Sequence, residues 1–241
     1  MATAVRNLIL TGGIFHPFET AAPALAAILE EQGITSDITE DMEAGLCDLA
    51  TGRYDMLTIY ALRWRMLGGG KYDEYREKWA YSPSPQARQA IVDHIADGGG
   101  LFGLHTAAIC FDDWPEWGKI LGATWVWGES GHPPHGPART RIDKPLDPLV
   151  AGLDDFILID EVYGDLTMEP DVEPIISETA ATNDGTDPHW QPVLWRRQWE
   201  GGRVGVDLLG HDAEALGHPV HRQIIARTAR WVADGRDDTA C

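Results

Sequence analysis

The stretch that decides the fold is Gly98-Gly99-Gly100-Leu101-Phe102-Gly103-Leu104-His105. Glycines end a preceding helix, a short apolar run follows, and a histidine comes directly after that run. A short apolar run bounded by turn residues is typical of a strand buried on both faces of a parallel sheet. Open α/β sheets bind ligands beyond the carboxyl ends of their strands. His105 is therefore the first candidate for a functional side chain; the alternative is a histidine that only hydrogen-bonds inside a tight strand-to-helix turn.

The rest of the chain alternates short buried runs with amphipathic helices, which predicts an α/β fold with a mainly parallel sheet. We expect strands at residues 8–10, 34–38, 55–60, 101–104, 122–127, 139–142, 156–159, 192–198 and 203–209. We expect helices at residues 20–32, 84–97, 114–121 and 219–233. Residues 62–85 carry three consecutive glycines and mixed charges, so we expect them to leave the sheet. No linker or repeat divides the chain, and a single domain over residues 1–241 is predicted.

Composition limits the classes of partner. The formal net charge of −19 argues against nucleic acid and against an anionic membrane surface, because both would repel the chain. Cys47, Cys110 and Cys241 are odd in number and lack metal-type spacing, which indicates reduced thiols inside a cell. The sequence shows neither a signal-peptide core nor an apolar run long enough to cross a bilayer. We therefore expect a cytoplasmic protein.

Several predicted strands end in a reactive side chain. Because parallel strands place their carboxyl ends at one edge of the sheet, we expect these side chains to line one pocket. They are His16, Tyr60, His105, Glu161, Tyr163, His211 and Asp212. His132 and His135 lie three residues apart in a proline-rich loop and could be metal ligands, although solvated loop residues are the favoured interpretation.

Two chemistries suit such a cluster. In one, His16, His105 and His211 bind a divalent metal such as zinc. In the other, histidine and carboxylate act as acid and base without a metal and move a proton beside a carbonyl. The sequence has no compact ligand motif, so it leaves this choice open and establishes no cofactor. Nucleophilic catalysis is not favoured, because His105 stands where a nucleophile elbow would place serine or cysteine, and Cys110 comes five residues later.

An ordered set of motifs spanning nearly the whole chain resembles the ThuA-like, trehalose-utilisation family. The motifs are Thr11-Gly12-Gly13 with His16-Pro17, Gly98-Gly99-Gly100-Leu101 through His105, Asp160-Glu161-x-Tyr163, Pro192-Val193-x-Trp195, and Gly202-Arg203-Val204 through Leu209-Gly210-His211-Asp212. The resemblance implies a flavodoxin-like, class I glutamine amidotransferase-like sandwich without the amidotransferase cysteine. It also implies a role in carbohydrate catabolism, associated with oxidised (3-keto) glycosides. The chain departs from the family pattern at residues 62–85 and 122–136, so trehalose itself is not implied as the substrate.

The combined hypothesis is an enzyme that acts on a sugar or ketoglycoside by isomerisation or elimination through an enediolate-like species. Its predicted catalytic residues are His105, Glu161 and His211. The predicted substrate-binding residues are His16, Tyr60, Tyr163, Trp127, Trp195 and Asp212, with the tryptophans supplying a stacking face. One alternative is a zinc-dependent hydrolase, and another is a non-catalytic sugar-binding accessory protein. A small carbohydrate is the expected partner. A homo-oligomer is possible, and the sequence leaves the oligomeric state open.

Overall fold

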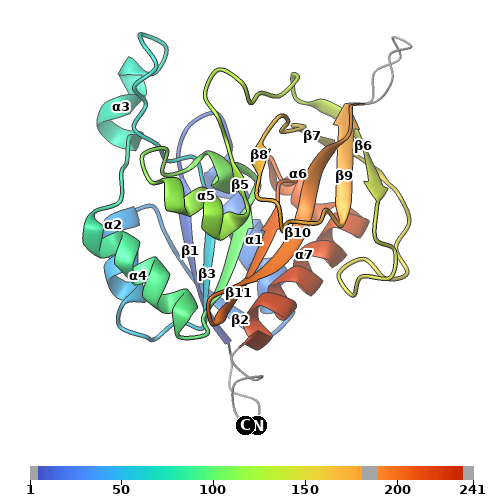
Figure 1. The fold of residues 1–241 in the computed structure, drawn as a ribbon, viewed down its shortest axis with the longest axis horizontal. Coiled ribbons are helices and arrows are strands. Elements are labelled where there is room, and N and C mark those ends of the chain that lie inside the picture. Colours follow the sequence, from blue (N-terminus) through green and yellow to red (C-terminus); the bar gives the residue numbers. More distant parts are fainter. Residues whose placement is uncertain (1–4, 181–188, 236–241) are drawn as a thin grey trace.

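A nine-stranded sheet forms the centre of the computed structural model, which describes residues 5–180 and 189–235 (Figure 1). The strand order is β2-β1-β3-β4-β11-β10-β9-β6-β7. The strands are β1 (Val5–Gly12), β2 (Ile34–Thr39), β3 (Met56–Ala61), β4 (Gly100–Leu104), β6 (Gly136–Ile142), β7 (Ile157–Asp160), β9 (Ile176–Ala180), β10 (Gln191–Trp199) and β11 (Gly202–Asp207). A separate two-stranded sheet pairs β5 (Ala123–Thr124) with β8 (Thr167–Met168).

The strand directions determine which carboxyl ends lie at the same edge of the sheet. From β2 to β11 all neighbouring strands are parallel, whereas each pair from β11 to β7 is antiparallel. This alternation gives β9 and β7 the same direction as β11. The carboxyl end of β7 therefore points to the same edge as those of β1, β4 and β11. The structure confirms the predicted α/β class and mainly parallel sheet.

Helices cover both faces of the parallel part. They are α1 (Phe18–Glu30), α2 (Met42–Leu49), α3 (Asp73–Trp79), α4 (Pro85–Ala96), α5 (Pro115–Leu121), α6 (Ala213–Gly217) and α7 (Pro219–Ala233), with a 3₁₀ helix η1 (His105–Ile109). Helices α1 and α7 pack together on one face, and α2 and α4 pack together on the other (Figure 1). Helix α4 begins where the sequence predicts, because Ser84 accepts a hydrogen bond from the backbone N–H of Ala87 and Pro85 occupies the first turn.

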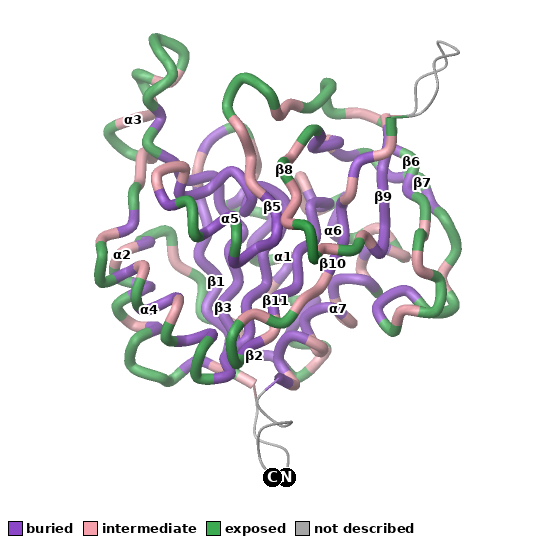
Figure 2. Tube along the Cα trace, viewed as in Figure 1, coloured by how far each residue is buried: buried purple, intermediate pink, exposed green. Residues whose placement is uncertain are grey.

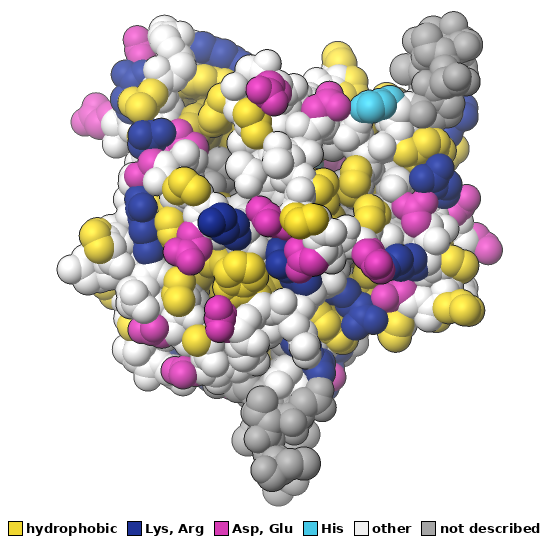
Figure 3. Space-filling model, viewed as in Figure 1, with side chains coloured by type: hydrophobic (Ala, Val, Ile, Leu, Met, Phe, Trp, Pro, Cys, Tyr) yellow, Lys and Arg dark blue, Asp and Glu magenta, His cyan; other side chains and the backbone are white. Residues whose placement is uncertain are grey.

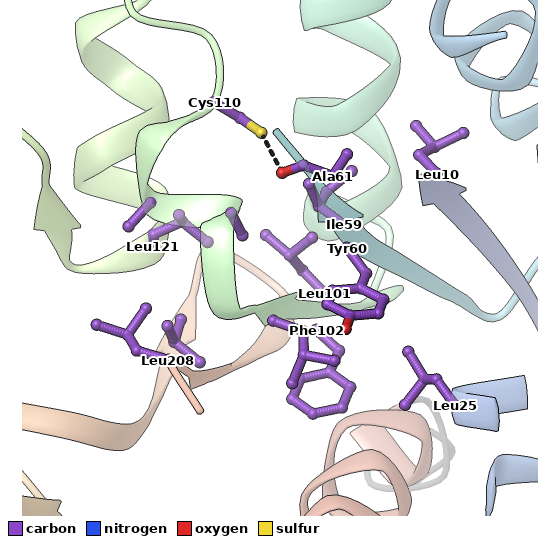
Figure 4. Close-up of a cluster of buried hydrophobic side chains, with 14 of the residues drawn as sticks. Leu10, Leu25, Ile59, Tyr60, Ala61, Leu101, Phe102, Cys110, Leu121 and Leu208 are labelled. Atoms are coloured by element: carbon purple, nitrogen blue, oxygen red, sulfur yellow. Dashed lines mark hydrogen bonds between the residues drawn. The ribbon is translucent and has the colours of Figure 1, made fainter. Parts of the chain in front are cut away.

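The core lies between the sheet and these two helical layers. Every residue of β3 and β4 is buried, as expected for strands covered on both faces, and Figure 2 shows the same for most of the sheet. Figure 4 shows Ile59, Tyr60, Leu101 and Phe102 in this core, with the Cys110 thiol donating to the carbonyl oxygen of Ala61 at 3.0 Å.

Some expected elements differ from those observed. The predicted strand at residues 122–127 is wrong beyond Ala123–Thr124, because the chain turns after the second residue. Five further elements were not predicted: α2, α3, α6, β8 and β9. Helix α2 had a local signal, since Asp41 accepts from the backbone N–H of Ala44 and caps it. Of the predicted excursion at residues 62–85, residues 62–84 leave the sheet and contain α3, whereas Pro85 already begins α4.

The surface carries charges of both signs. Acidic and basic side chains are interspersed over the face seen in Figure 3, with apolar side chains scattered among them. Within the described ranges, no helix combines the length and apolar character needed to cross a membrane.

Candidate functional site

His105 is the first residue of η1 and directly follows β4, so it makes the turn from strand to helix. Its φ of +49° lies in the left-handed region, which costs energy for a residue with a side chain and persists only where the surroundings impose it. The side chain is fully buried, and its Nδ1 lies 2.8 Å from the carbonyl oxygen of Leu208, just after β11. The structure thus places His105 at the strand-to-helix turn that the sequence predicted.

Four side chains from separate segments converge at this turn. His16 follows β1, Glu161 follows β7 and His211 follows β11, and together with His105 each offers a ligand atom within 4.8 Å of the others. The Nε2 atoms of His16 and His105 are 3.1 Å apart. Glu161 Oε2 lies 3.4 Å from His16 Nε2, 3.9 Å from His105 Nε2 and 3.5 Å from His211 Nδ1. We call these four residues the histidine–glutamate cluster.

Backbone carbonyls fix the orientation of two of the imidazoles. The Nδ1 atom of His105 faces the Leu208 carbonyl, and that of His16 faces the Ile14 carbonyl at 3.1 Å. Because a carbonyl oxygen only accepts, each Nδ1 carries the hydrogen, and in a neutral ring Nε2 is then an acceptor. The Tyr163 hydroxyl lies 3.1–3.2 Å from both Nε2 atoms and from Glu161 Oε2. One hydroxyl proton therefore faces three acceptors.

The charges of the cluster follow from its burial and its contacts. Burial and the neighbouring His16 lower the pKa of His105 well below its ordinary value, so this ring is neutral. Burial alone would raise the pKa of Glu161, but the histidine side chains that surround its carboxylate hold that pKa far below its usual range. Burial alone would lower the pKa of His211, but the neighbouring Glu161 carboxylate raises that pKa above its ordinary value. Burial raises the pKa of Tyr163 well above its ordinary value, so its hydroxyl keeps its proton.

Asp160 ties the two halves of the site together. Its carboxylate accepts hydrogen bonds from the backbone N–H groups of Gly210 at 2.7 Å, Glu161 at 2.8 Å and His211 at 3.1 Å. The end of β7 is thereby fastened to the segment after β11, although β10, β9 and β6 separate these strands in the sheet. Asp160 stands in the sequence motif Asp160-Glu161-x-Tyr163, but no role was predicted for it.

Two loop histidines also border the cluster, although the sequence favoured solvated loop positions for them. His132 Nδ1 lies 3.8 Å from Glu161 Oε1, and its ring centroid is 5.4 Å from that of Tyr163. The ring centroid of His135, an exposed residue, is 4.4 Å from that of His211. Both residues belong to the loop before β6, so this loop lies at the open side of the cluster.

The remaining predicted binding residues take other positions. Tyr60 is buried, and its hydroxyl donates to the Gly210 carbonyl at 2.6 Å, so it supports the His211 segment from below. Asp212 accepts from the backbone N–H of Ala215 and caps α6, and its carboxylate also lies within 4.8 Å of ligand atoms of His135 and His211 at the border of the cluster. Trp195 is fully buried and its indole N–H donates to the Leu121 carbonyl at 2.8 Å, so the expectation that it forms a stacking face is wrong.

Trp127 differs from Trp195 in presenting an open ring. It is 46% exposed, and its ring lies stacked on that of Trp64 with the centroids 5.5 Å apart. The cysteines offer no nucleophile at the turn: burial raises the pKa of the Cys110 thiol to about 12, Cys47 is exposed elsewhere, and Cys241 lies outside the described residues.

Comparison with known proteins places the chain in a family. A profile of the ThuA family, described as trehalose utilisation, matches residues 6–232. A putative ThuA-like protein from Parabacteroides merdae superposes with a TM-score of 0.74 at 18% identity, over 96% of this chain and 90% of that one. A second, from Bacteroides uniformis, gives 0.66 at 19% identity, over 96% and 93% of the two chains.

A more distant structural match is a cytoplasmic protein from Salmonella typhimurium, with a TM-score of 0.61 at 13% identity over 93% of this chain and 98% of that one. At such identities the structural likeness shows a shared fold. No curated protein matches the sequence. The family profile, in contrast, covers almost the whole chain and includes every residue of the histidine–glutamate cluster. The chain therefore belongs to the ThuA, or trehalose-utilisation, family.

Proposed function

We propose that this chain is an enzyme of carbohydrate catabolism that acts on a sugar or ketoglycoside at the histidine–glutamate cluster, with a divalent cation held there. Membership of a trehalose-utilisation family supports the carbohydrate part of the proposal. One observation carries the rest: three acceptor atoms of His16, His105 and Glu161 surround one point with a single hydroxyl proton between them. A bound cation relieves the repulsion among these lone pairs.

The donor set fits zinc. Tetrahedral zinc with bonds of about 2.0–2.2 Å to nitrogen and oxygen holds its ligand atoms about 3.4 Å apart. The four measured separations within the cluster run from 3.1 to 3.9 Å. Histidine ligands of metals generally donate their other N–H to a carbonyl or carboxylate, as His16 and His105 do here. His211 Nδ1 is buried and makes no hydrogen bond to any described residue, which suits a ligand atom.

The proposed reaction is a proton shift beside a carbonyl, leading to isomerisation or elimination. A divalent cation supplies the polarisation of the substrate carbonyl that makes the adjacent C–H acidic. Glu161 and the three histidines would hold the cation, and a substrate oxygen would add to these four ligands, as zinc sites allow when they expand to five-coordinate. The Tyr163 hydroxyl would donate a hydrogen bond to that oxygen. His132 and His135, on the open side, are imidazoles able to take up and return the proton.

Metal content and turnover test the proposal together. We expect near-equimolar zinc or a similar ion in purified wild-type protein and in a His189→Ala control, because His189 is exposed and pairs with Asp165 away from the cluster. Substitutions of residues that hydrogen-bond metal ligands lower metal affinity roughly 10–100-fold. Glu161→Gln and His105→Ala remove ligands themselves, so their affinity for the metal should fall further. Activity on a panel of glycosides and 3-ketoglycosides should fall in parallel.

The alternatives give different results in the same experiment. Turnover by metal-free protein would refute the role of the cation and would favour acid–base catalysis by the cluster residues alone. Hydrolysis without isomerised or eliminated product would overturn the proposed reaction type. Sugar binding without any product would make the chain an accessory binding protein, and the cluster variants would then lose affinity alone.

A further inference from the structure

A groove lies beside the cluster and belongs to the segment that leaves the sheet. It has a volume of about 340 Å³ and is lined by Trp64, Arg65, Leu67, Tyr72, Asp112 and Trp127. Most of these residues belong to the first part of the segment 62–84, which leaves the sheet. This segment includes α3 and projects away from the helices that cover the sheet (Figures 1 and 2). We call it the aromatic groove. None of the chemistry proposed for the cluster uses it.

One wall of the aromatic groove is a flat aromatic surface. Trp127 stacks on Trp64, and Tyr72 meets Trp64 edge to face with ring centroids 5.1 Å apart. Trp64 is buried and fixes Trp127 from one side, while nearly half of the Trp127 surface stays open. A rigid aromatic ring with a polar edge nearby suits a ligand that has an apolar face and hydrogen-bonding groups around its rim. Sugar rings have this character.

The other wall carries hydrogen-bonding groups. Arg65 Nε lies 3.2 Å from both carboxylate oxygens of Asp112, and the Arg65 backbone N–H donates to the same carboxylate at 3.0 Å. The two terminal nitrogens of Arg65 make no hydrogen bond to any described residue, and the side chain is 42% exposed. They are available donors. Because Asp112 neutralises the guanidinium, the wall favours hydroxyl groups and does not require an anion.

A single indole separates the aromatic groove from the cluster. The Trp125 ring centroid lies 6.1 Å from that of Trp127 and 5.6 Å from that of Tyr163. Tyr163 in turn stacks on His105 with centroids 4.6 Å apart. We propose that the aromatic groove is a second-ring subsite, which binds the sugar ring or cyclic aglycone attached to the ring that reacts at the cluster. The proposal rests on the proposed function and assigns to Trp127 and Arg65 the binding of the second ring of a two-ring glycoside.

Sugar binding tests the subsite with defined probes. Calorimetry would compare glucose with trehalose, maltose and cellobiose on wild-type protein, Trp127→Ala and Arg65→Gln. The control is Trp199→Ala, which removes a half-buried tryptophan at the opposite edge of the sheet. We expect wild type and the control to bind at least one disaccharide about tenfold more tightly than glucose. Both groove variants should lose that preference and keep glucose affinity and metal content.

The possible failures are distinguishable. If wild type binds glucose and disaccharides equally, or if the variants keep the preference, the subsite is refuted and the proposed function stands. If wild type binds none of the sugars, the carbohydrate function is refuted and the subsite with it. Phe15, Leu67 and Trp127 are exposed apolar side chains, so sedimentation is measured as well. A dimer that Trp127→Ala dissociates, with sugar affinities unchanged, would make the groove an interface and overturn the proposal.

Discussion

Replacing Asp160 with asparagine should weaken both the fold and the cation site. The carboxylate accepts three backbone hydrogen bonds, two at one oxygen and one at the other. Asparagine keeps the shape, and its carbonyl oxygen can still serve Glu161 and His211. Its NH₂ group then faces the N–H of Gly210, so one bond is lost and one buried donor is left unpaired. An unpaired buried group costs about 1–3 kcal/mol, and loss of the charge-assisted character adds to it.

We therefore expect Asp160→Asn to lower the free energy of unfolding by about 2–4 kcal/mol. At roughly 2–4 °C per kcal/mol for a chain of this size, the melting temperature falls by about 4–16 °C. Because both site-bearing segments lose their common anchor, zinc affinity should fall about 10–100-fold. The matched control is Asp155→Asn, whose exposed carboxylate accepts one backbone hydrogen bond from Ile142.

Differential scanning calorimetry and competitive zinc titration measure the two effects. The control should stay within about 1 kcal/mol of wild type and bind zinc normally. An Asp160→Asn protein that melts like the control and binds zinc like wild type would refute the positioning role. If Asp160→Asn is destabilised but keeps its zinc affinity, Asp160 contributes to stability and does not position the cation site.

Two further predictions concern strain and pH. His105 has a φ of +49°, so His105→Gly should be about 1 kcal/mol more stable than His105→Ala by thermal melting, and equal stabilities would contradict the strain. Buried His221 has its ring nitrogens 2.8 Å from the Ala215 carbonyl and 3.1 Å from Asp207, and although burial lowers its pKa, Asp207 raises it above 6.5. Its stabilisation is fully present below pH 6.5 and is lost as pH rises through the raised value, by at most about 1.4 kcal/mol per pH unit. Urea melts from pH 6 to 9 should show this slope in wild type, and a slope that persists in His221→Gln would assign it to another group.

The sequence by itself determined the central strand and its turn. The glycine-bounded run before His105 reads as a buried strand because its signals are local: apolar residues in succession and glycines where a helix ends. The same holds for α4, whose cap and first-turn proline are adjacent in the chain. The parallel half of the sheet follows from repeated strand–helix alternation, and with it the shared edge that carries His16, His105 and His211.

Only the tertiary structure decided which other side chains reach that edge. Glu161 follows β7, which pairs only with β6 at the end of the sheet, and it joins the cluster because Asp160 binds the segment after β11. Trp195 points into the core, in a strand whose register shifts between Pro192 and Leu194, whereas Trp127 stays open. Sheet order and strand register depend on partners far away in the sequence, and a shift of one residue turns a side chain to the opposite face. Local sequence propensity does not specify those distant partners, so only the folded structure shows the complete site.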